Sequence, residues 1–331
     1  MTWSTFKDPR TWLAAGAFLF ALTALLLPRV PLQRDAYDVV AVVDITTSMN
    51  TRDVPSGSDK VSRLDAAKTA LRETLAKLPC GSRFGLGFFT ERRSFLLFEP
   101  VEVCENFAPV DGAIAMLDWR MAWEGDSYIS KGLFSALELA GSLKSDLIFL
   151  TDGHELPPLP FSGVAPFEGK PGDVGGLIVG VGGRTPSPLL KYDDNGHEIG
   201  TYGAQEVPQE NRSGPPPPDA ASRPGYHPKW APFGNAVVNN REHMGVVREA
   251  YLKQLASMTG LSYAYLAGPH DLAEPLRRAA HPRALTVATD ISAAAGSTAL
   301  LLLVLIYVLG ALDVRRPLTS THHATRPEGA F

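Results

Sequence analysis

Two long segments without charge, one near each end of the chain, limit most strongly what this sequence can fold into. Residues 11–27 and 291–312 carry no charged side chain, and each is long enough to cross a bilayer as a helix. A cleavable signal peptide is the alternative for the first segment, but the following Pro28-Arg29-Val30-Pro31 lacks a small-x-small cleavage pattern. A buried core helix is the alternative for the second, although Leu300–Leu309 is apolar around its full circumference. The sequence therefore predicts transmembrane helices over 11–28 and 291–312.

Basic residues beside these segments predict their orientation. Lys7 and Arg10 precede the first segment, and Arg315 and Arg316 follow the second. Short basic flanks stay in the cytoplasm, so residues 1–10 and 313–331 are predicted to be cytoplasmic tails and 35–290 an outward-facing domain. Arg29 and Arg34 weaken this prediction without reversing it.

Composition and cysteine content agree with an exported globular domain. Hydrophobic residues make up 45% of the chain, which is enough for a core, and the net charge of −4 argues against nucleic acid as a partner. The only two cysteines, Cys80 and Cys104, lie in the outward part. An oxidising compartment permits a disulfide between them, and two unpaired buried thiols are the alternative.

The outward part reads as alternating strands and helices. Asp38–Val43 is a continuous β-branched run typical of a strand buried on both faces. Further strands are predicted at 84–89, 94–101, 146–150, 174–181 and 262–266, and helices at 61–78, 111–117, 130–139, 246–259 and 271–280. An insertion of about 185–242 holds a predicted hairpin with its turn at Asn195-Gly196 and a proline-rich loop. This order predicts an α/β fold with a doubly wound, mostly parallel sheet.

Hydroxyl and carboxylate side chains lie in three loops of this predicted domain. Asp44, Thr46 and Ser48 come directly after the first strand, Ser127 precedes a helix, and Asp152 follows the strand at 146–150. The carboxyl ends of parallel strands share one edge of a sheet, and these oxygens are hard ligands suited to Mg²⁺. The first loop alone is equally compatible with a plain turn or a helix cap.

In order and spacing, these three loops resemble those of the von Willebrand factor A (VWA) domain. Its metal-ion-dependent adhesion site (MIDAS) is built from Asp-x-Ser-x-Ser, a Thr and an Asp. The resemblance implies a metal site formed by Asp44, Thr46, Ser48, Ser127 and Asp152. Thr46 and Ser127 replace the usual Ser and Thr but keep the hydroxyl oxygen. The implied cofactor is a divalent cation, with Mg²⁺ favoured and Mn²⁺ or Ca²⁺ open. Asp126, where the family commonly has Gly, is a candidate for contacts around the ligands.

An A domain between two terminal anchors resembles the bacterial membrane-anchored VWA proteins found with MoxR-type ATPases. The resemblance implies a non-enzymatic, protein-binding module in the inner membrane with its VWA domain in the periplasm. Its expected partners are a protein client that presents a carboxylate, other VWA membrane proteins and a MoxR-type ATPase. Some relatives accompany periplasmic methanol dehydrogenase, which implies a role in maturation, such as calcium insertion into a quinoprotein dehydrogenase.

Two other functions stay open. A metal-dependent phosphohydrolase also begins with an Asp after a buried strand, but its motif needs a second Asp where this chain has Thr46. An adhesin is the other alternative, although two anchors would hold the domain close to the membrane. His154 and Glu155 follow Asp152, and we interpret His154 as a loop residue near the site rather than a general base.

Overall fold

The computed structural model describes residues 8–26, 29–238 and 240–314. Lys7, Arg315 and Arg316, on which the orientation was predicted, lie outside these ranges, as does nearly all of the predicted tail 313–331. The described residues divide into two compact units. Asp35–Ala284 forms one, and the described parts of Met1–Arg34 and Leu285–Phe331 form the other.

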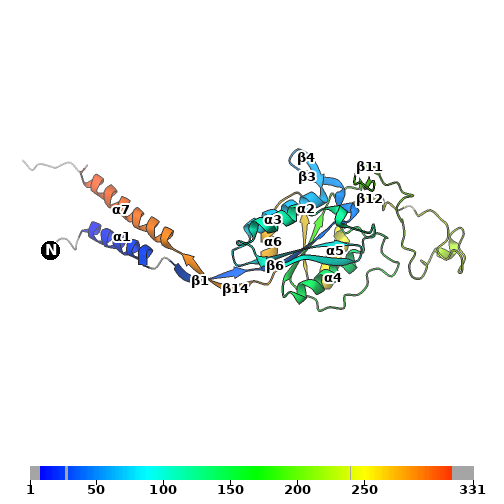
Figure 1. Cartoon of the computed structure of the whole chain (residues 1–331), viewed down its shortest axis with the longest axis horizontal. Coiled ribbons are helices and arrows are strands. Elements are labelled where there is room, and N and C mark those ends of the chain that lie inside the picture. The colour runs from blue at the N-terminus through cyan, green and yellow to red at the C-terminus, as the bar shows by residue number, and fades with distance from the viewer. Residues whose placement is uncertain (1–7, 27–28, 239, 315–331) are drawn as a thin grey trace, which may run out of the picture. The chain divides into compact units, whose positions relative to one another are not determined.

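The terminal unit holds two helices that are long and apolar enough to cross a membrane, α1 (Pro9–Leu26) and α7 (Ser292–Val314). They lie side by side and run antiparallel (Figure 1). Two contacts show this arrangement: the Arg10 guanidinium donates to the Leu309 carbonyl at 3.3 Å, and Gly16 lies against Leu302. Most of their large apolar side chains are exposed, which is the opposite of what a soluble core helix shows. The strands β1 (Arg29–Ala36) and β14 (Arg283–Asp290), which were not predicted from the sequence, pair in a two-stranded ladder.

A six-stranded sheet forms the centre of the larger unit, in the order β13-β8-β7-β2-β5-β6. Neighbouring strands are parallel except at the edge, where β6 runs antiparallel to β5. The predicted α/β fold with a mostly parallel sheet is confirmed. The strands are β2 (Asp38–Asp44), β5 (Arg83–Thr90), β6 (Arg93–Glu102), β7 (Asp146–Thr151), β8 (Gly176–Val181) and β13 (Ser262–Leu266).

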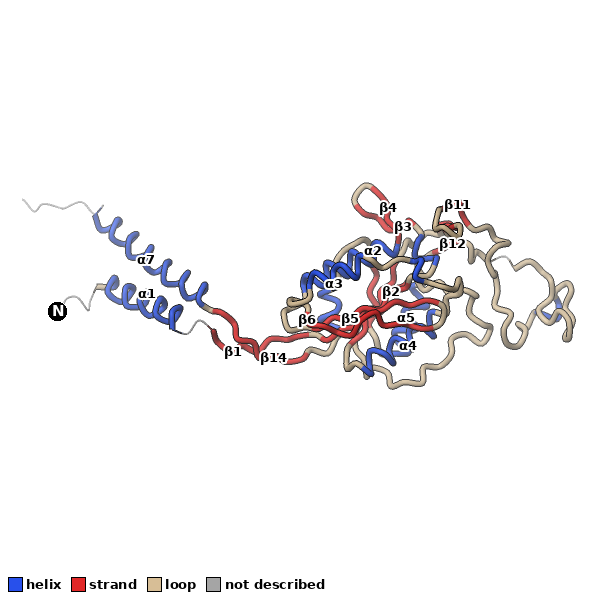
Figure 2. The backbone as a smooth tube through the Cα atoms, viewed as in Figure 1, coloured by secondary structure: helices blue, strands red, loops and turns tan. Residues whose placement is uncertain are grey.

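Helices cover both faces of this sheet (Figure 2). Val39, Ala41 and Val43 of β2 point into one core, while Val40 and Val42 point into the other, so the continuous apolar run fills two cores at once. The first core is closed by α2 (Arg63–Lys77), α3 (Phe107–Ala115) and α6 (Ala273–Ala279), and the second by α4 (Ile129–Ser142) and α5 (Glu249–Thr259).

The helices α2 and α5 begin two and three residues later than predicted, because backbone hydrogen bonds hold the preceding residues outside the helix. Val61 lies in β4 (Asp59–Ser62), which pairs with β3 (Arg52–Ser56) in a hairpin that the sequence analysis missed. Before α5, the amide of Val247 donates to Gly183 and that of Arg248 to the carbonyl of Asp152. The start of α5 is therefore tied directly to the loop after β7.

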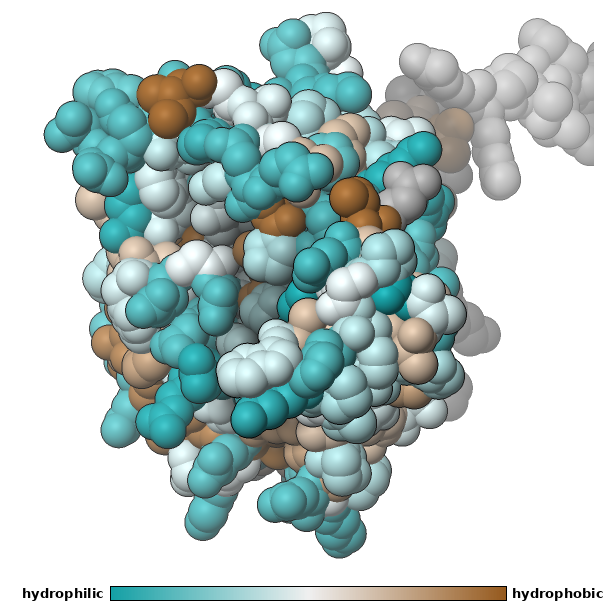
Figure 3. Space-filling view, turned by 90° about the vertical axis from the view of Figure 1, so that its right-hand side faces the viewer, coloured by the Kyte–Doolittle hydropathy of each residue, from teal (hydrophilic) through white to brown (hydrophobic). Residues whose placement is uncertain are grey.

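The insertion contains little regular structure. The predicted hairpin is confirmed as β10 (Leu190–Tyr192) paired antiparallel with β11 (Glu198–Thr201), with Gly196 in the left-handed region at φ 81°. The other short elements are β9 (Ser187–Pro188), β12 (Met244–Gly245) and a 3-10 turn at Ala220–Ser222. Figure 3 shows the insertion end of the molecule as mostly hydrophilic with small, separate apolar patches. Such a face does not form a continuous apolar docking surface.

Candidate metal centre

The loop after β2 gathers three of the predicted ligands. One carboxylate oxygen of Asp44 accepts hydrogen bonds from the amide of Thr46 at 2.9 Å and from its hydroxyl at 2.7 Å. The Thr46 and Ser48 hydroxyl oxygens are 3.4 Å apart, and a 3-10 turn over Thr47–Asn50 sets their spacing. All three side chains are buried. The turn thus places one carboxylate and two hydroxyls together, as expected.

The loop after β7 contributes the second carboxylate. β7 lies beside β2 in parallel register, so Thr151-Asp152 emerges next to Asp44. The Thr151 hydroxyl donates to the other oxygen of Asp44 at 2.6 Å, which fixes both oxygens of this carboxylate. Asp152 is fully buried, and one of its oxygens accepts from the amide of His154 at 2.9 Å.

Ser127 reaches the same place from the loop before α4. Its amide donates to the carbonyl of Leu156 at 2.6 Å, and its carbonyl accepts from the amide of Leu156 at 2.9 Å. Its hydroxyl is buried and has no hydrogen-bond partner among the described residues. Together with Thr46 and Ser48, Ser127 lines a cavity of about 230 Å³ at the carboxyl edge of the sheet. A buried hydroxyl without a partner, in a cavity lined by two further hydroxyl side chains, fits the oxygen ligands that a divalent cation prefers.

The charge around Asp44 also fits a cation. Burial, and secondly the negative charge of Asp152, raise the pKa of Asp44 from 3.8 to about 7, although the hydrogen bonds from Thr151 and Thr46 oppose this shift. Desolvation and a like charge both disfavour the ionised carboxylate, and a bound cation would offset both effects.

Arg63 provides the only buried guanidinium in this cluster among the described residues, and sequence reasoning missed it. Its side chain is fully buried and donates to Asp152 Oδ2 at 2.5 Å and to both oxygens of Asp53, at 2.5 and 3.0 Å. Arg63 is the first residue of α2, and its partner Asp152 is 89 residues away, so no local pattern in the sequence could pair them. Fully ionised, Asp44, Asp53, Asp152 and Arg63 carry a net charge of −2.

Glycines make room for this buried guanidinium. Gly182 has φ +130°, and a Cβ built on it would lie 2.5 Å from Arg63 Nε. A Cβ on Gly245 would lie 2.9 Å from Arg63 Nη1. The chain after β8 and the end of the insertion therefore close over Arg63 and keep water from its ion pairs.

The insertion forms the outer wall of the cavity. Its lining includes Leu189, Tyr202, Glu206, Val207 and Pro208. Glu206 is engaged on both oxygens, by the Lys191 ammonium and by the amide of Gly203 at 2.8 Å, and these contacts lower its pKa. The sequence analysis identified the insertion but not its position over the predicted ligands.

His154 and Asp126 border the same cavity. His154 is 2% exposed, and burial lowers its pKa, which favours a neutral imidazole. Glu155 lies outside the cavity lining; its carboxylate accepts from the amide of Ser130 at 3.1 Å and from the Tyr251 hydroxyl, and burial raises its pKa.

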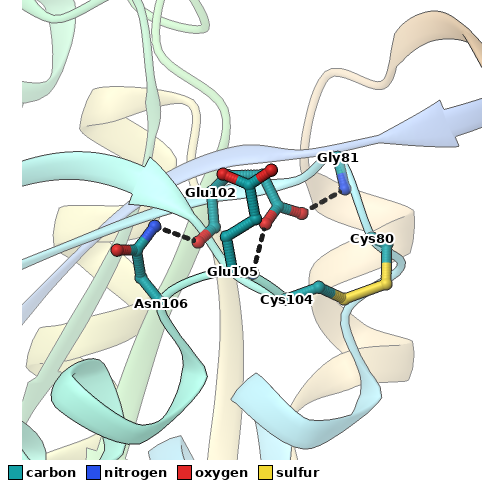
Figure 4. The surroundings of a disulfide bond; sticks show 6 residues. All are labelled: Cys80, Gly81, Glu102, Cys104, Glu105 and Asn106. Carbon is teal, nitrogen blue, oxygen red and sulfur yellow. Dashed lines mark hydrogen bonds between the residues drawn. A yellow bond between two sulfur atoms is a disulfide. The ribbon is translucent and has the colours of Figure 1, made fainter.

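The two cysteines lie at the end of the sheet where the parallel strands begin. The structure joins Cys80 and Cys104 in a disulfide (Figure 4), between the start of β5 and the end of β6. Glu102 reinforces this connection by accepting from the amides of Gly81 and Glu105, each at 2.6 Å. Because β5 runs parallel to β2, the start of β5 lies at the opposite end of the strands from the cavity, which is at their carboxyl ends.

Sheet order, helix layers and loop positions define an α/β domain with a candidate metal centre at the carboxyl edge. Residues 39–154 match the family model of the von Willebrand factor type A domain. The chain therefore contains a VWA domain, which confirms the predicted type of domain and its fold. No curated protein sequence matches the chain significantly.

Three solved structures are similar to this chain. An aerotolerance-related membrane protein from Bacteroides fragilis is 14% identical, with 70% of this chain and 91% of that chain covered and a TM-score of 0.41. An uncharacterized membrane spanning protein from Vibrio fischeri is 18% identical, with 69% and 91% covered and a TM-score of 0.27. A pilus adhesin from Lactobacillus rhamnosus is 17% identical, with 51% and 22% covered and a TM-score of 0.28.

Proposed function

We propose that the VWA domain binds a divalent cation and uses it to dock a carboxylate of a protein partner. The observation that carries this proposal is the cavity at the sheet edge, which is lined by Thr46, Ser48 and Ser127 and adjoins the loops of two buried carboxylates, Asp44 and Asp152. Asp44 and Asp152 would complete the ligand set, directly or through water.

The donor set supports Mg²⁺ as the favoured ion. Every proposed ligand atom is a hard oxygen, which suits Mg²⁺, Mn²⁺ and Ca²⁺ better than softer metals. The net charge of −2 on the four buried ionisable groups matches a divalent ion, and Arg63 keeps this charge from reaching −3. A bound cation would supply an open coordination position for a ligand from outside the domain.

Docking is favoured over hydrolysis by the first loop. A phosphohydrolase of the kind considered above needs a second carboxylate two residues after Asp44. Thr46 stands there, and its hydroxyl donates to Asp44. We therefore propose a binding protein rather than an enzyme. An acidic side chain of the partner is the ligand that a cation held by hydroxyls and carboxylates would accept.

The two terminal helices support a membrane anchor. Arg10 near the start of α1 contacts Leu309 near the end of α7, so the two helices run antiparallel. If both helices span the membrane, both termini lie on the same side of it. Together with the basic flanks, this supports cytoplasmic termini and a periplasmic VWA domain. The disulfide fits an oxidising compartment.

We extend the proposal to a role in assembly or maturation of an exported protein. The arrangement of a VWA domain between two anchors resembles proteins that work with MoxR-type ATPases, and calcium insertion into a periplasmic quinoprotein dehydrogenase is the specific activity that this resemblance favours. A MoxR-type ATPase or other VWA membrane proteins would be its partners.

Calorimetric titration of the full chain in detergent with Mg²⁺ tests the cation site. We expect binding in the wild type and loss of binding in Asp44→Ala. Asp111→Ala is the matched control, because Asp111 is a carboxylate paired with Arg72 on the surface, and it should bind as the wild type does. Unchanged affinity in Asp44→Ala would place the cation elsewhere.

Chelation tests the docking role. A protein partner that co-purifies with the wild type should be released by chelator and should rebind on addition of Mg²⁺ or Mn²⁺. Metal-dependent turnover of a phosphate ester by the isolated chain, together with chelator-resistant partner binding, would contradict docking and favour the phosphohydrolase.

A further inference from the structure

His154 is buried beside the proposed cation site without a hydrogen bond for its ring. The side chain is 2% exposed, and neither ring nitrogen has a hydrogen-bond partner among the described residues. An oxygen of Glu242 lies 3.5 Å from Nε2, but this oxygen already accepts a hydrogen bond from Arg248 at 2.7 Å. Buried polar groups are rarely left unpaired, because desolvation without a partner is unfavourable.

The backbone holds this imidazole in place. The amide of His154 donates to Asp152 at 2.9 Å, and the neighbouring Gly153 adopts φ +77°, with Leu252 of α5 lying against it. The ring lines the same cavity as Ser127, whose hydroxyl is also unpaired. Two unpaired polar side chains that face one cavity indicate that the cavity takes a polar ligand.

The dimensions of the cavity limit that ligand. Its volume of about 230 Å³ is below the range of roughly 300–1,000 Å³ that is usual for small-molecule sites. The insertion contributes Leu189, Tyr202 and Val207 to the wall, so the entrance is partly apolar. One carboxylate on a short stem fits this space, whereas a broad protein surface does not.

We propose that His154 is a specificity-determining residue that donates an N–H hydrogen bond to the carboxylate docked at the cation. The inference rests on the proposed function, since the cation would hold one carboxylate oxygen and His154 the other. An imidazole presents at least one N–H in either protonation state, so this role requires no change of charge. The site would thereby select a carboxylate over ligands with a single donor atom.

The full chain in detergent, loaded with Mn²⁺, tests this role by water-proton relaxation. A carboxylate that displaces water from the bound ion lowers the relaxation enhancement. The probes are acetate and a blocked Gly-Asp-Gly peptide, which distinguish a free small acid from an acidic side chain. We expect both to bind the wild type. Binding of acetate alone would keep the role of His154 and identify a free acid as the ligand.

Variants at His154 separate this role from a structural one. We expect His154→Leu to weaken carboxylate binding about tenfold relative to Mn²⁺ binding, and His154→Gln, which keeps an N–H donor, to restore part of it. His197→Leu is the matched control, because His197 lies on the exposed hairpin turn, and it should change neither affinity.

Three outcomes would overturn the inference in different ways. Equal carboxylate binding in His154→Leu and wild type would show that the imidazole does not contact the ligand. A parallel loss of Mn²⁺ affinity would show that it coordinates the ion instead. Absence of Mn²⁺ binding in the wild type would refute the proposed function, and this inference with it.

Discussion

The candidate metal centre has a sheet side and a loop side that differ in how their polar atoms are satisfied. On the sheet side, which consists of Asp44, Thr151, Asp152 and Arg63, each side chain has hydrogen bonds to a neighbour. On the loop side, which comprises Ser127, His154 and the insertion wall, the Ser127 hydroxyl and both His154 nitrogens have none among the described residues.

This difference separates what builds the fold from what is available for a ligand. Breaking a contact on the sheet side leaves a buried charge without a partner, so changes there should be destabilising. On the loop side, the side chains of Ser127 and His154 have no internal hydrogen bond to lose among the described residues, so changes at these two positions should act on binding with little effect on folding.

The largest effect is expected from Arg63→Met. Removing the guanidinium leaves Asp53 and Asp152 buried without their cation, and the free energy of unfolding should fall by about 3–5 kcal/mol. Denaturant unfolding of the full chain, followed by tryptophan fluorescence, measures it. Arg72→Met is the matched control in the same helix, since the exposed Arg72–Asp111 pair should contribute at most about 1 kcal/mol. Similar losses of stability in the two variants would show that the buried ion pairs of Arg63 stabilise the fold no more than an exposed pair does.

A pH-dependent effect is expected at Asp44. Because the pKa of Asp44 is about 7 in the folded protein and 3.8 ordinarily, the folded state binds more protons between these values, and its stability should fall as pH rises through this window. Relative to Asp44→Asn, the metal-free wild type should lose up to a few kcal/mol, at about 1.4 kcal/mol per pH unit.

Thermal unfolding at pH 4 to 8 with chelator, and again with Mg²⁺, measures this effect. Mg²⁺ should restore the wild type at high pH and leave Asp44→Asn unchanged. If the unfolding temperature without metal varied with pH in the same way in both proteins, the prediction would be wrong. Asp44 would then be ionised throughout this pH range, with its charge already balanced by the residues around it.

The smallest effect on stability is expected from Ser127→Ala. Since its hydroxyl has no partner, the free energy of unfolding should change by less than about 0.5 kcal/mol, while Mg²⁺ affinity should fall about tenfold, or roughly 1.4 kcal/mol. Ser94→Ala provides the contrast: its buried hydroxyl donates to Gly132 at 2.8 Å, so it should lose about 1 kcal/mol of stability and no affinity. A destabilised Ser127→Ala with normal affinity would remove the distinction between the two sides.

Local patterns were sufficient for the elements that carry the predicted ligands. The apolar run of β2 ending in Asp44, and that of β7 ending before Asp152, marked two parallel strands and the edge where their loops meet. The start of α2 was predicted two residues early because Val61 has helical spacing, yet its pairing with Val54 holds it in a strand. Pairing between segments overrides local preference at such boundaries.

By itself, the sequence determined the α/β class, the positions along the chain of the strands of the central sheet, and the three loops that carry Asp44, Ser127 and Asp152, because these features follow from periodicity and the parallel rule over short stretches. Only the tertiary structure decided that Arg63 neutralises Asp152, that the insertion walls the cavity and that the His154 ring is left unpaired. These contacts join residues far apart in the chain. Burial and charge in the folded domain determine which of these residues pair, and such pairing produces no periodic pattern in the sequence.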